Sequence, residues 1–156
     1  MKFLIFMKKP RRCPKAWTCS KPFLFLGRHC PSIFFFKRYN DEYGHVVGDI
    51  VLKNIAATLL KSITPSDLAA RYGGEEYVVL LPGKTKDRAL MIAEDIRWQI
   101  ERNKLSLRRL ETRVTASLGV AAFPEDGRTK EEILWAADKC LYQAKNLGRN
   151  RVCGVI

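Results

Sequence analysis

After residue 39, the apolar positions first recur with the period of a helix. Three stretches, residues 49–62, 85–103 and 129–148, carry apolar side chains three and four positions apart, and each predicts an amphipathic helix. Residues that cap helices, or that cannot continue them, lie at the ends of these stretches. The residues that mark the ends are Pro65, Thr85, Thr129 with Glu132, and Gly148.

Strand-like patterns occupy the segments between these helices. Residues 68–72 and 77–81 are short apolar runs on either side of Gly73-Gly74-Glu75-Glu76, which predicts a β-hairpin. Apolar residues alternate from Val114 to Val120, as in a half-buried strand, and a short strand over 151–155 is expected to close the chain. The order helix, hairpin, helix, strand, helix predicts an α+β fold with helices packed on a sheet.

The first 38 residues do not share this organisation. They carry ten of the 28 Lys and Arg residues and no acid, whereas the other 118 residues carry 18 basic and 16 acidic side chains. The net charge of +12 therefore belongs mostly to this leader. A basic arm for nucleic acid or anionic lipid is one interpretation, and a poorly ordered tail is the other. Its apolar runs at 23–26 and 33–36 are too short to span a membrane, and either can form a buried strand.

The five cysteines include no CxxC pair, so neither a zinc ribbon nor a secreted disulfide framework is supported. Cys140 lies on the apolar face of the last predicted helix, where we expect it to be buried as a small hydrophobic residue. No signal peptide is evident, and a reducing cytoplasm is the expected location.

The candidate chemistry lies at the tip of the predicted hairpin. Glu75 and Glu76 are adjacent like charges in a tight turn, an arrangement that folding alone does not favour. A divalent cation would relieve this repulsion, and the missing side chains of Gly73 and Gly74 would let a bulky substrate approach the backbone. An ordinary glycine hairpin with solvated acids explains these four residues about as well.

Four segments in matching order resemble the GGDEF domain family, the diguanylate cyclases. Residues 71–77, RYGGEEY, resemble the family signature in its GGEEF form, with Tyr in place of Phe. Residues 36–49 match FKxxND-x-x-GH-x-x-GD, residues 117–121 match S-x-G-[VI]-A, and residues 136–150 match the ending AD-x-x-[LM]Y-x-AK-x-x-GRN. The resemblance implies a catalytic domain over residues 36–156 with a nucleotidyl-cyclase-like fold, in which helices cover a mostly antiparallel central sheet.

The resemblance further implies that two GTP molecules condense into cyclic di-GMP with release of two pyrophosphates. Each domain would hold one GTP, so catalysis would require a homodimer, with no part for nucleic acid or a membrane segment. Glu75 and Glu76 would be catalytic and, with Ile33, would hold Mg²⁺ or Mn²⁺. The residues implied in substrate binding are Lys37, Asn40, His45 and Asp49, then Gly73 and Gly74 at the hairpin, and Lys145 and Arg149 near the end of the last helix.

Single residues of this set also have simpler explanations. Asp49 could cap its helix, Lys145 and Arg149 could favour a helix C-terminus, and Asn40 and His45 could be turn residues. It is the spacing of the whole set that favours the functional interpretation.

The sequence departs from the family upstream of Phe36. The family pattern D-x-D-x-FK has Ser32 and Phe34 at its two aspartates, and the leading D-x-LTGL-x-NRR helix is absent. Loss of a carboxylate predicts weak magnesium binding and a lower rate, and it leaves a catalytically degenerate GTP-binding or protein-interaction module as the alternative function. We hypothesise that residues 1–35 are read in an altered frame or from a misassigned start.

A second departure concerns product inhibition. Many family members carry an R-x-x-D site shortly before the signature, whereas this chain has Thr64-Pro65-Ser66-Asp67. Because the arginine is missing, we expect no product inhibition through this site.

Overall fold

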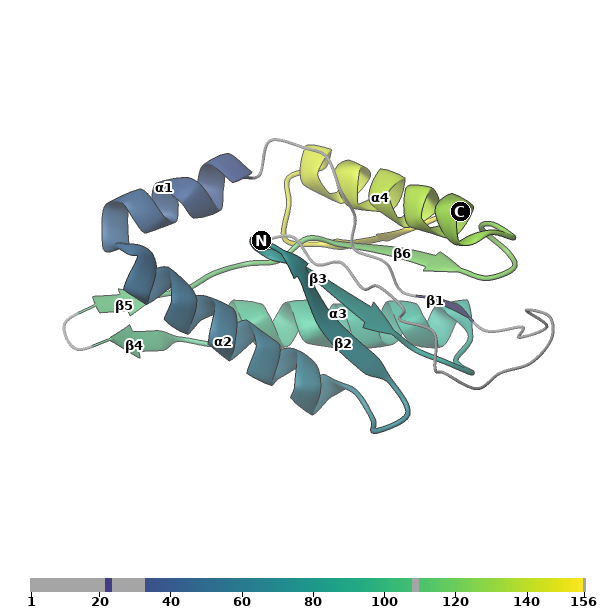
Figure 1. Cartoon of the computed structure of the whole chain (residues 1–156), viewed down its shortest axis with the longest axis horizontal. Coiled ribbons are helices and arrows are strands. Elements are labelled where there is room, and N and C mark those ends of the chain that lie inside the picture. The colour runs from purple at the N-terminus through teal and green to yellow at the C-terminus, as the bar shows by residue number, and fades with distance from the viewer. Residues whose placement is uncertain (1–21, 24–32, 108–109, 156) are drawn as a thin grey trace.

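A computed structural model of the chain describes residues 22–23, 33–107 and 110–155 (Figure 1). Helices and short strands are interleaved along the chain, as the sequence pattern predicts. The helices are α1 (Ile33–Tyr43), α2 (His45–Ser62), α3 (Lys86–Arg102) and α4 (Lys130–Asn146). The strands are β1 (Pro22–Phe23), β2 (Leu68–Gly73), β3 (Glu76–Leu80), β4 (Leu105–Leu107), β5 (Leu110–Thr112), β6 (Leu118–Ala122) and β7 (Val152–Gly154).

Most of the strand pairings are antiparallel. Within the described residues, β6 pairs with β1 antiparallel and with β7 parallel, while β2–β3 and β4–β5 form two antiparallel hairpins. The predicted α+β class is confirmed, with the described strands divided among three small sheets. The predicted β2–β3 hairpin is also confirmed, and its register shifts between Arg71 and Gly73.

Strand β6 is the centre of the core. All five of its residues are buried, because α4 covers one face of β6 and β7 and α3 covers the other (Figure 1). Gly119 lets α4 approach, since a Cβ there would lie 2.1 Å from the Ala137 carbonyl oxygen. The prediction of a half-buried strand starting at Val114 is therefore wrong: the strand starts at Leu118, and helices on both faces remove it from water.

Helix α2 packs against the β2–β3 hairpin. Its buried residues include Val51, Leu52, Ile55 and Leu59, at the spacing that predicted the helix. Tyr77 of β3 is buried, and its hydroxyl donates to the Leu52 carbonyl oxygen at 2.8 Å. The tyrosine that replaces the family phenylalanine thus ties β3 to α2.

Helix α4 confirms its sequence signals. Thr129 and Glu132 form the reciprocal capping box, and Gly148 follows the helix with a φ of 111°. Cys140 is 2% exposed, as expected, and burial raises the pKa of its thiol to about 11. The predicted N-cap of α3, Thr85, accepts a hydrogen bond from the Arg88 amide.

Helix α1 corrects one expectation. The run 33–36, expected as a buried strand, lies in this helix. Its physical reason is aromatic side chains at helical spacing: Phe36 stacks on Tyr39, and Tyr39 packs against Tyr43 with ring centroids 4.8 Å apart. Of the run 23–26, Phe23 forms strand β1, and the rest lies outside the described residues.

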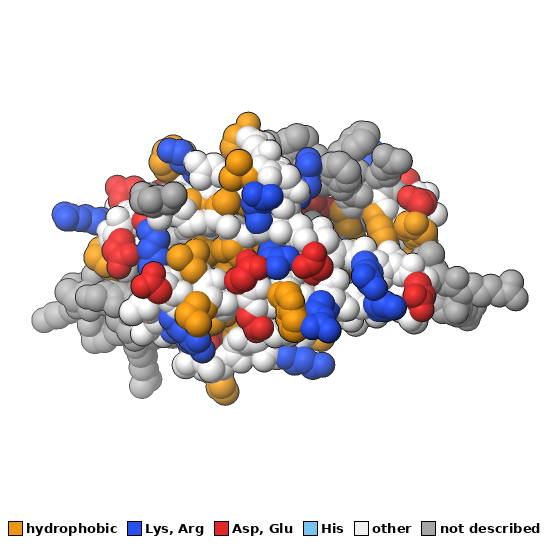
Figure 2. All heavy atoms as spheres, turned by 180° about the vertical axis from the view of Figure 1, so that it is seen from behind, with side chains coloured by type: hydrophobic (Ala, Val, Ile, Leu, Met, Phe, Trp, Pro, Cys, Tyr) orange, Lys and Arg blue, Asp and Glu red, His pale blue; other side chains and the backbone are white. Residues whose placement is uncertain are grey.

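Most of the predicted leader, residues 1–21 and 24–32, also lies outside the described residues. The described surface seen from behind carries acidic and basic side chains interspersed, with hydrophobic side chains scattered among them (Figure 2). None of the described helices is long and apolar enough to cross a membrane.

Candidate active site

The corner between α1 and α2 brings Asn40 close to Gly48. Gly44 makes the tight junction between the helices with a φ of 83°, and its amide donates to the Asn40 carbonyl oxygen at 2.7 Å. A Cβ on Gly48 would lie 1.9 Å from Asn40 Oδ1, so only glycine leaves room for the Asn40 amide. Asn40 Oδ1 is buried and has no hydrogen-bond partner among the described residues. This acceptor is the strongest sign of a ligand at the corner.

Asp49 and His45 lie on the same corner. His45 is the first residue of α2, and Asp49 follows one turn later with its side chain exposed. The explanation of Asp49 as a helix cap is wrong, because the helix begins four residues earlier with Gly44 as its N-cap. Asn40 belongs to α1 rather than to a turn.

The hairpin tip places two glycines beside two carboxylates. Gly74 has a φ of 51°, which a glycine adopts at little cost, while Gly73 has no left-handed φ; a Cβ on either would meet nothing within 4 Å. Glu75 is only 5% exposed, and Glu76 is half-buried. Arg71 braces the turn by donating from Nε to the Gly74 carbonyl oxygen at 2.7 Å. The turn is therefore fixed by its own contacts, yet it is open on the side of its glycines.

The end of α4 carries two of the predicted substrate-binding residues. Lys145 is 7% exposed, and Arg149 is exposed in the loop that follows. The amides of Gly148 and Arg149 donate back to the carbonyl oxygens of Lys145 and Ala144, in the pattern of a Schellman motif. Burial of Lys145 is more than a favourable charge at a helix end requires, since exposed lysines serve that purpose.

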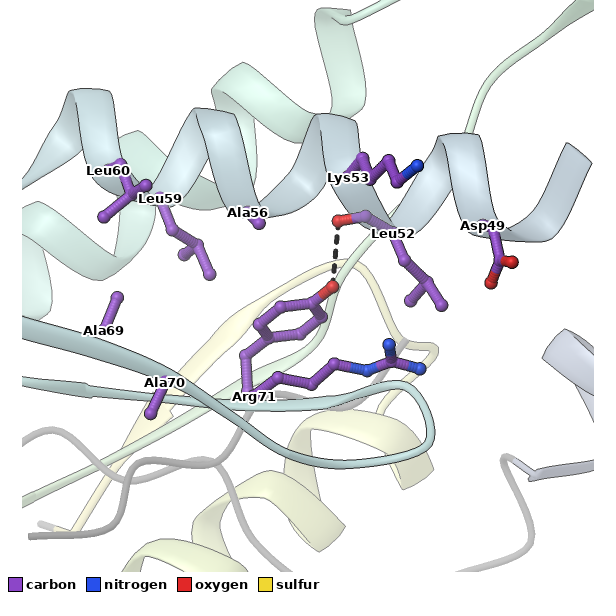
Figure 3. Close-up of a pocket in the computed structure, with 10 residues that line it drawn as sticks. Asp49, Leu52, Lys53, Ala56, Leu59, Leu60, Ala69, Ala70 and Arg71 are labelled. Carbon is purple, nitrogen blue, oxygen red and sulfur yellow. Dashed lines mark hydrogen bonds between the residues drawn. The ribbon is translucent and has the colours of Figure 1, made fainter. Parts of the chain in front are cut away.

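Most of the predicted residues thus belong to three places: the corner between α1 and α2, the hairpin tip and the end of α4. Figures 1 and 3 show the hairpin turn between the first half of α2 and α4, whereas the corner between α1 and α2 lies at the left end of the molecule in Figure 1. Lys37 is exposed on α1, and Ile33 is the first residue of that helix. Ser32 lies outside the described residues.

A pocket of about 390 Å³ lies between α2 and β2 (Figure 3). Its walls are apolar, formed by residues such as Ala56, Leu59 and Ala69, and Asp49, Lys53 and Arg71 supply its charges. Of the predicted site residues, only Asp49 lines it. Lys53 and Arg71 were not predicted as site residues. Their sequence signals are that Arg71 begins the segment that resembles the signature and that Lys53 lies one helical turn after the segment 36–49.

The residues at the tip suit a divalent cation by their chemistry. Mg²⁺ and Mn²⁺ take carboxylate oxygens, and Glu75 offers a buried carboxylate beside that of Glu76. The described residues hold no cluster of three or more His, Cys, Asp and Glu side chains placed to bind a metal. The donor set fits the ion with two side-chain carboxylates.

Asp67, at the position of the family's inhibition site, serves the fold instead. Its carboxylate accepts hydrogen bonds from the Thr64 amide at 2.9 Å and the Thr64 hydroxyl at 2.6 Å, and it forms an ion pair with Lys84. Burial alone would raise the pKa of Asp67, but these partners outweigh it and lower the pKa below its ordinary value.

Comparison with known proteins identifies the family. The model of the family "Diguanylate cyclase, GGDEF domain" matches residues 31–151. The chain is 42% identical over 120 residues to diguanylate cyclase A of Treponema denticola, covering 77% of this chain and 32% of that protein. It is 44% identical over 124 residues to the response regulator PleD of Caulobacter vibrioides, covering 78% and 27%. The chain therefore spans about a third or less of the length of these relatives.

Solved structures agree. The GGDEF domain of DgcB from Caulobacter crescentus, in complex with cyclic di-GMP, superposes with a TM-score of 0.72 at 29% identity over 86% of this chain and 74% of that one. The active GGEEF domain of a diguanylate cyclase from Vibrio cholerae superposes with a TM-score of 0.69 at 27% identity over 86% and 79%. The chain belongs to the GGDEF domain family of diguanylate cyclases.

Proposed function

We propose that this domain condenses two GTP molecules into cyclic di-GMP and releases two pyrophosphates. The observation that carries the proposal is the hairpin tip, where a buried carboxylate lies beside two glycines that face open space. The conformation of Gly73 does not call for glycine, and no neighbour would clash with a side chain there. Room for a substrate explains this glycine, whereas the fold does not.

We assign guanine recognition to the corner between α1 and α2. Asn40 Oδ1 can accept a hydrogen bond from a guanine N–H, and the Asp49 carboxylate can accept another from the same edge of the base. His45 lies one turn before Asp49 on α2, at the rim of this corner. Gly48 supports the assignment because it leaves room for the Asn40 amide at this corner.

We assign binding of the triphosphate to Lys37, Lys145 and Arg149. A lysine offers a point charge and an arginine a planar fork of donors, both suited to phosphate oxygens. Gly73 and Gly74 leave space for the phosphates at the turn. Glu76 and Glu75 lie beside them, where a carboxylate can accept the proton of the attacking 3′-hydroxyl.

Glu75, Glu76 and the backbone at Ile33 would hold Mg²⁺ or Mn²⁺. When bound, the ion lowers the pKa of a coordinated hydroxyl and offsets charge on phosphate oxygens. Because Ser32 replaces a family aspartate, the prediction of weak ion binding stays part of the proposal.

One GTP per domain requires two domains for a product with two guanosines, so we place the reaction in a homodimer in the cytoplasm, where GTP is made and used. The segment matched in this chain makes up 32% and 27% of these two relatives, so we make no proposal about the signal that controls the reaction in the whole protein.

The test incubates the full chain with GTP and MgCl₂ and separates the products by chromatography. We expect cyclic di-GMP from the unsubstituted chain and a loss of at least about a hundredfold in Glu76→Gln. Glu131→Gln, an exposed glutamate in the first turn of α4, is the matched control and is expected to keep full activity. GTP binding without any cyclic product, even at high protein concentration, would favour the degenerate module instead.

A further inference from the structure

The loop after α4 has an unusual backbone. Gly148, Arg149 and Asn150 follow one another with φ values of 111°, 63° and 46°, all in the left-handed region. Glycine adopts this region freely and asparagine tolerates it, but a long side chain such as that of Arg149 carries a steric cost. Such a conformation persists only where the surrounding structure holds it, and it often occurs at functional sites.

Three side chains from two distant segments hold the loop. Asn150 Nδ2 donates to Glu101 Oε1 at 2.6 Å, and Arg97 Nη1 donates to Asn150 Oδ1 at 3.0 Å. Arg97 Nη1 also donates to Glu101 Oε2 at 2.7 Å, which closes a ring of charge-assisted contacts. Arg97 and Glu101 lie on adjacent turns of α3, so the loop is tied to a helix some fifty positions earlier in the chain.

The ring involves both polar atoms of the Asn150 amide. Its oxygen faces the guanidinium and its nitrogen faces the carboxylate, so neither aspartate nor leucine could replace it without losing a contact. The Arg97 side chain is only 12% exposed, and hydrogen bonds from Arg97 and Asn150, together with the charge of Arg97, lower the pKa of Glu101. The contacts therefore fix the orientation of residue 150, directly after Arg149.

We propose that Arg97, Glu101 and Asn150 are positioning residues for the nucleotide triphosphate, acting through Arg149. The inference rests on the proposed function, in which Arg149 binds that triphosphate. With residue 150 fixed on α3 and Gly148 fixed by the Schellman motif, the backbone of Arg149 is held from both sides. A fixed backbone lowers the entropic cost of presenting the Arg149 side chain to a ligand.

A purely structural role would give different behaviour. If the ring only joined α3 to the loop, its loss would lower stability and weaken all ligands alike. If it positions Arg149, its loss weakens ligands with phosphates and spares guanosine, which has none.

The test compares two variants with a matched control in the full chain. Asn150→Gly removes the side chain but keeps the left-handed backbone accessible, and Glu101→Ala removes the carboxylate. Glu94→Ala is the control, because Glu94 also pairs with Arg97, whereas the hydrogen bonds of the Asn150 side chain go to Arg97 and Glu101. Binding of GTP and of guanosine is measured by NMR titration, with thermal melting as a check on folding.

We expect both variants to bind GTP about tenfold more weakly and guanosine unchanged, and Glu94→Ala to bind both normally. In an Arg149→Ala background, Asn150→Gly is expected to have no further effect on GTP binding, because the two residues act as one unit. Unchanged GTP affinity in both variants, or an equal loss for guanosine, overturns the inference and leaves the proposed function intact. Failure of the unsubstituted chain to bind GTP overturns both.

Discussion

Two glycines, one in the core and one at the hairpin tip, differ in whether packing requires a residue without a side chain. Gly119 lies in β6 beneath α4, where a Cβ would lie 2.1 Å from the Ala137 carbonyl oxygen and 2.5 Å from the Leu141 amide nitrogen. Gly73 lies at the hairpin tip, where a Cβ would meet nothing within 4 Å and the φ is not left-handed. Packing accounts fully for the first glycine and not at all for the second.

Polar side chains divide in the same way. Asp67 is buried directly before β2, and its carboxylate is bound by Thr64 and Lys84. Asn40 Oδ1 is buried at the α1–α2 corner without a hydrogen-bond partner among the described residues. A buried polar group whose hydrogen bonds are made within the fold contributes to stability, whereas a buried polar group without such a partner indicates a place where a ligand can bind.

The largest expected effect, and so the strongest test of this comparison, is at Gly119. A methyl group there collides with backbone atoms of α4, which cannot rotate away as a side chain can, so we expect Gly119→Ala to lower the free energy of unfolding by about 3 kcal/mol. Urea denaturation followed by circular dichroism measures the change. A loss below about 0.5 kcal/mol would show that α4 can shift away from β6, and the contrast with Gly73 would then disappear.

The next effect in size is expected at Asp67. Asp67→Asn keeps the shape of the side chain but loses the ion pair with Lys84, and we expect a cost of about 2 kcal/mol. Ser66→Ala is the control, because Ser66 contacts Thr64 on the exposed side of the same turn, and it is expected to cost less than about 0.5 kcal/mol.

The same carboxylate gives a pH dependence. The pKa of Asp67 is lowered in the folded protein, so its stabilising contribution is complete above its ordinary value of 3.8 and is lost as the pH falls below that value toward the folded pKa. Unfolding measured between pH 3 and 7 should therefore show a smaller loss on acidification in Asp67→Asn than in the unsubstituted chain. Equal acid sensitivity in the two proteins would mean that other carboxylates dominate.

Much of the fold follows from local signals in the sequence. The capping box at Thr129, the cap at Thr85 and the glycine pair at 73–74 each specify backbone geometry within a few residues, and the structure has the expected element at each place. Burial of β6 on both faces could not be read from alternation, because it depends on α3 and α4 meeting the same strand. Strands β4 and β5 have three residues each, too few for a period to show.

In the candidate site, too, the sequence predicts local features but not contacts between distant segments. Motif spacing named Asn40, Asp49 and the hairpin carboxylates, but it could not show that Asn40 lies against Gly48. The tie between Asn150 and Glu101 joins residues 49 positions apart, and no pattern of spacing predicts such a contact. The sequence named the residues that we propose to bind the nucleotide, and only the structure shows that Arg97 and Glu101 hydrogen-bond with Asn150.

At the hairpin tip, substitutions of the two glycines are expected to distinguish the cost of a strained backbone conformation from the cost of filling open space. Gly74 has a φ of 51°, so Gly74→Ala is strained and should cost about 1 kcal/mol of unfolding free energy, although nothing lies within 4 Å of the new methyl group. This variant measures the cost of left-handed backbone at the turn, and it serves as the reference for its neighbour.

The smallest cost to folding is expected at Gly73. Gly73→Ala has neither strain nor a clash, so its free energy of unfolding should stay within about 0.5 kcal/mol of the unsubstituted chain. Its methyl group, however, would occupy the space that we assign to the phosphates, and a small displacement of a substrate there should lower the rate of cyclic di-GMP formation by about a hundredfold. Denaturation and product chromatography on the same protein samples test both parts. A Gly73→Ala protein with full activity would mean that the open space beside the tip is not where the substrate binds, because a methyl group in that space would then obstruct no phosphate.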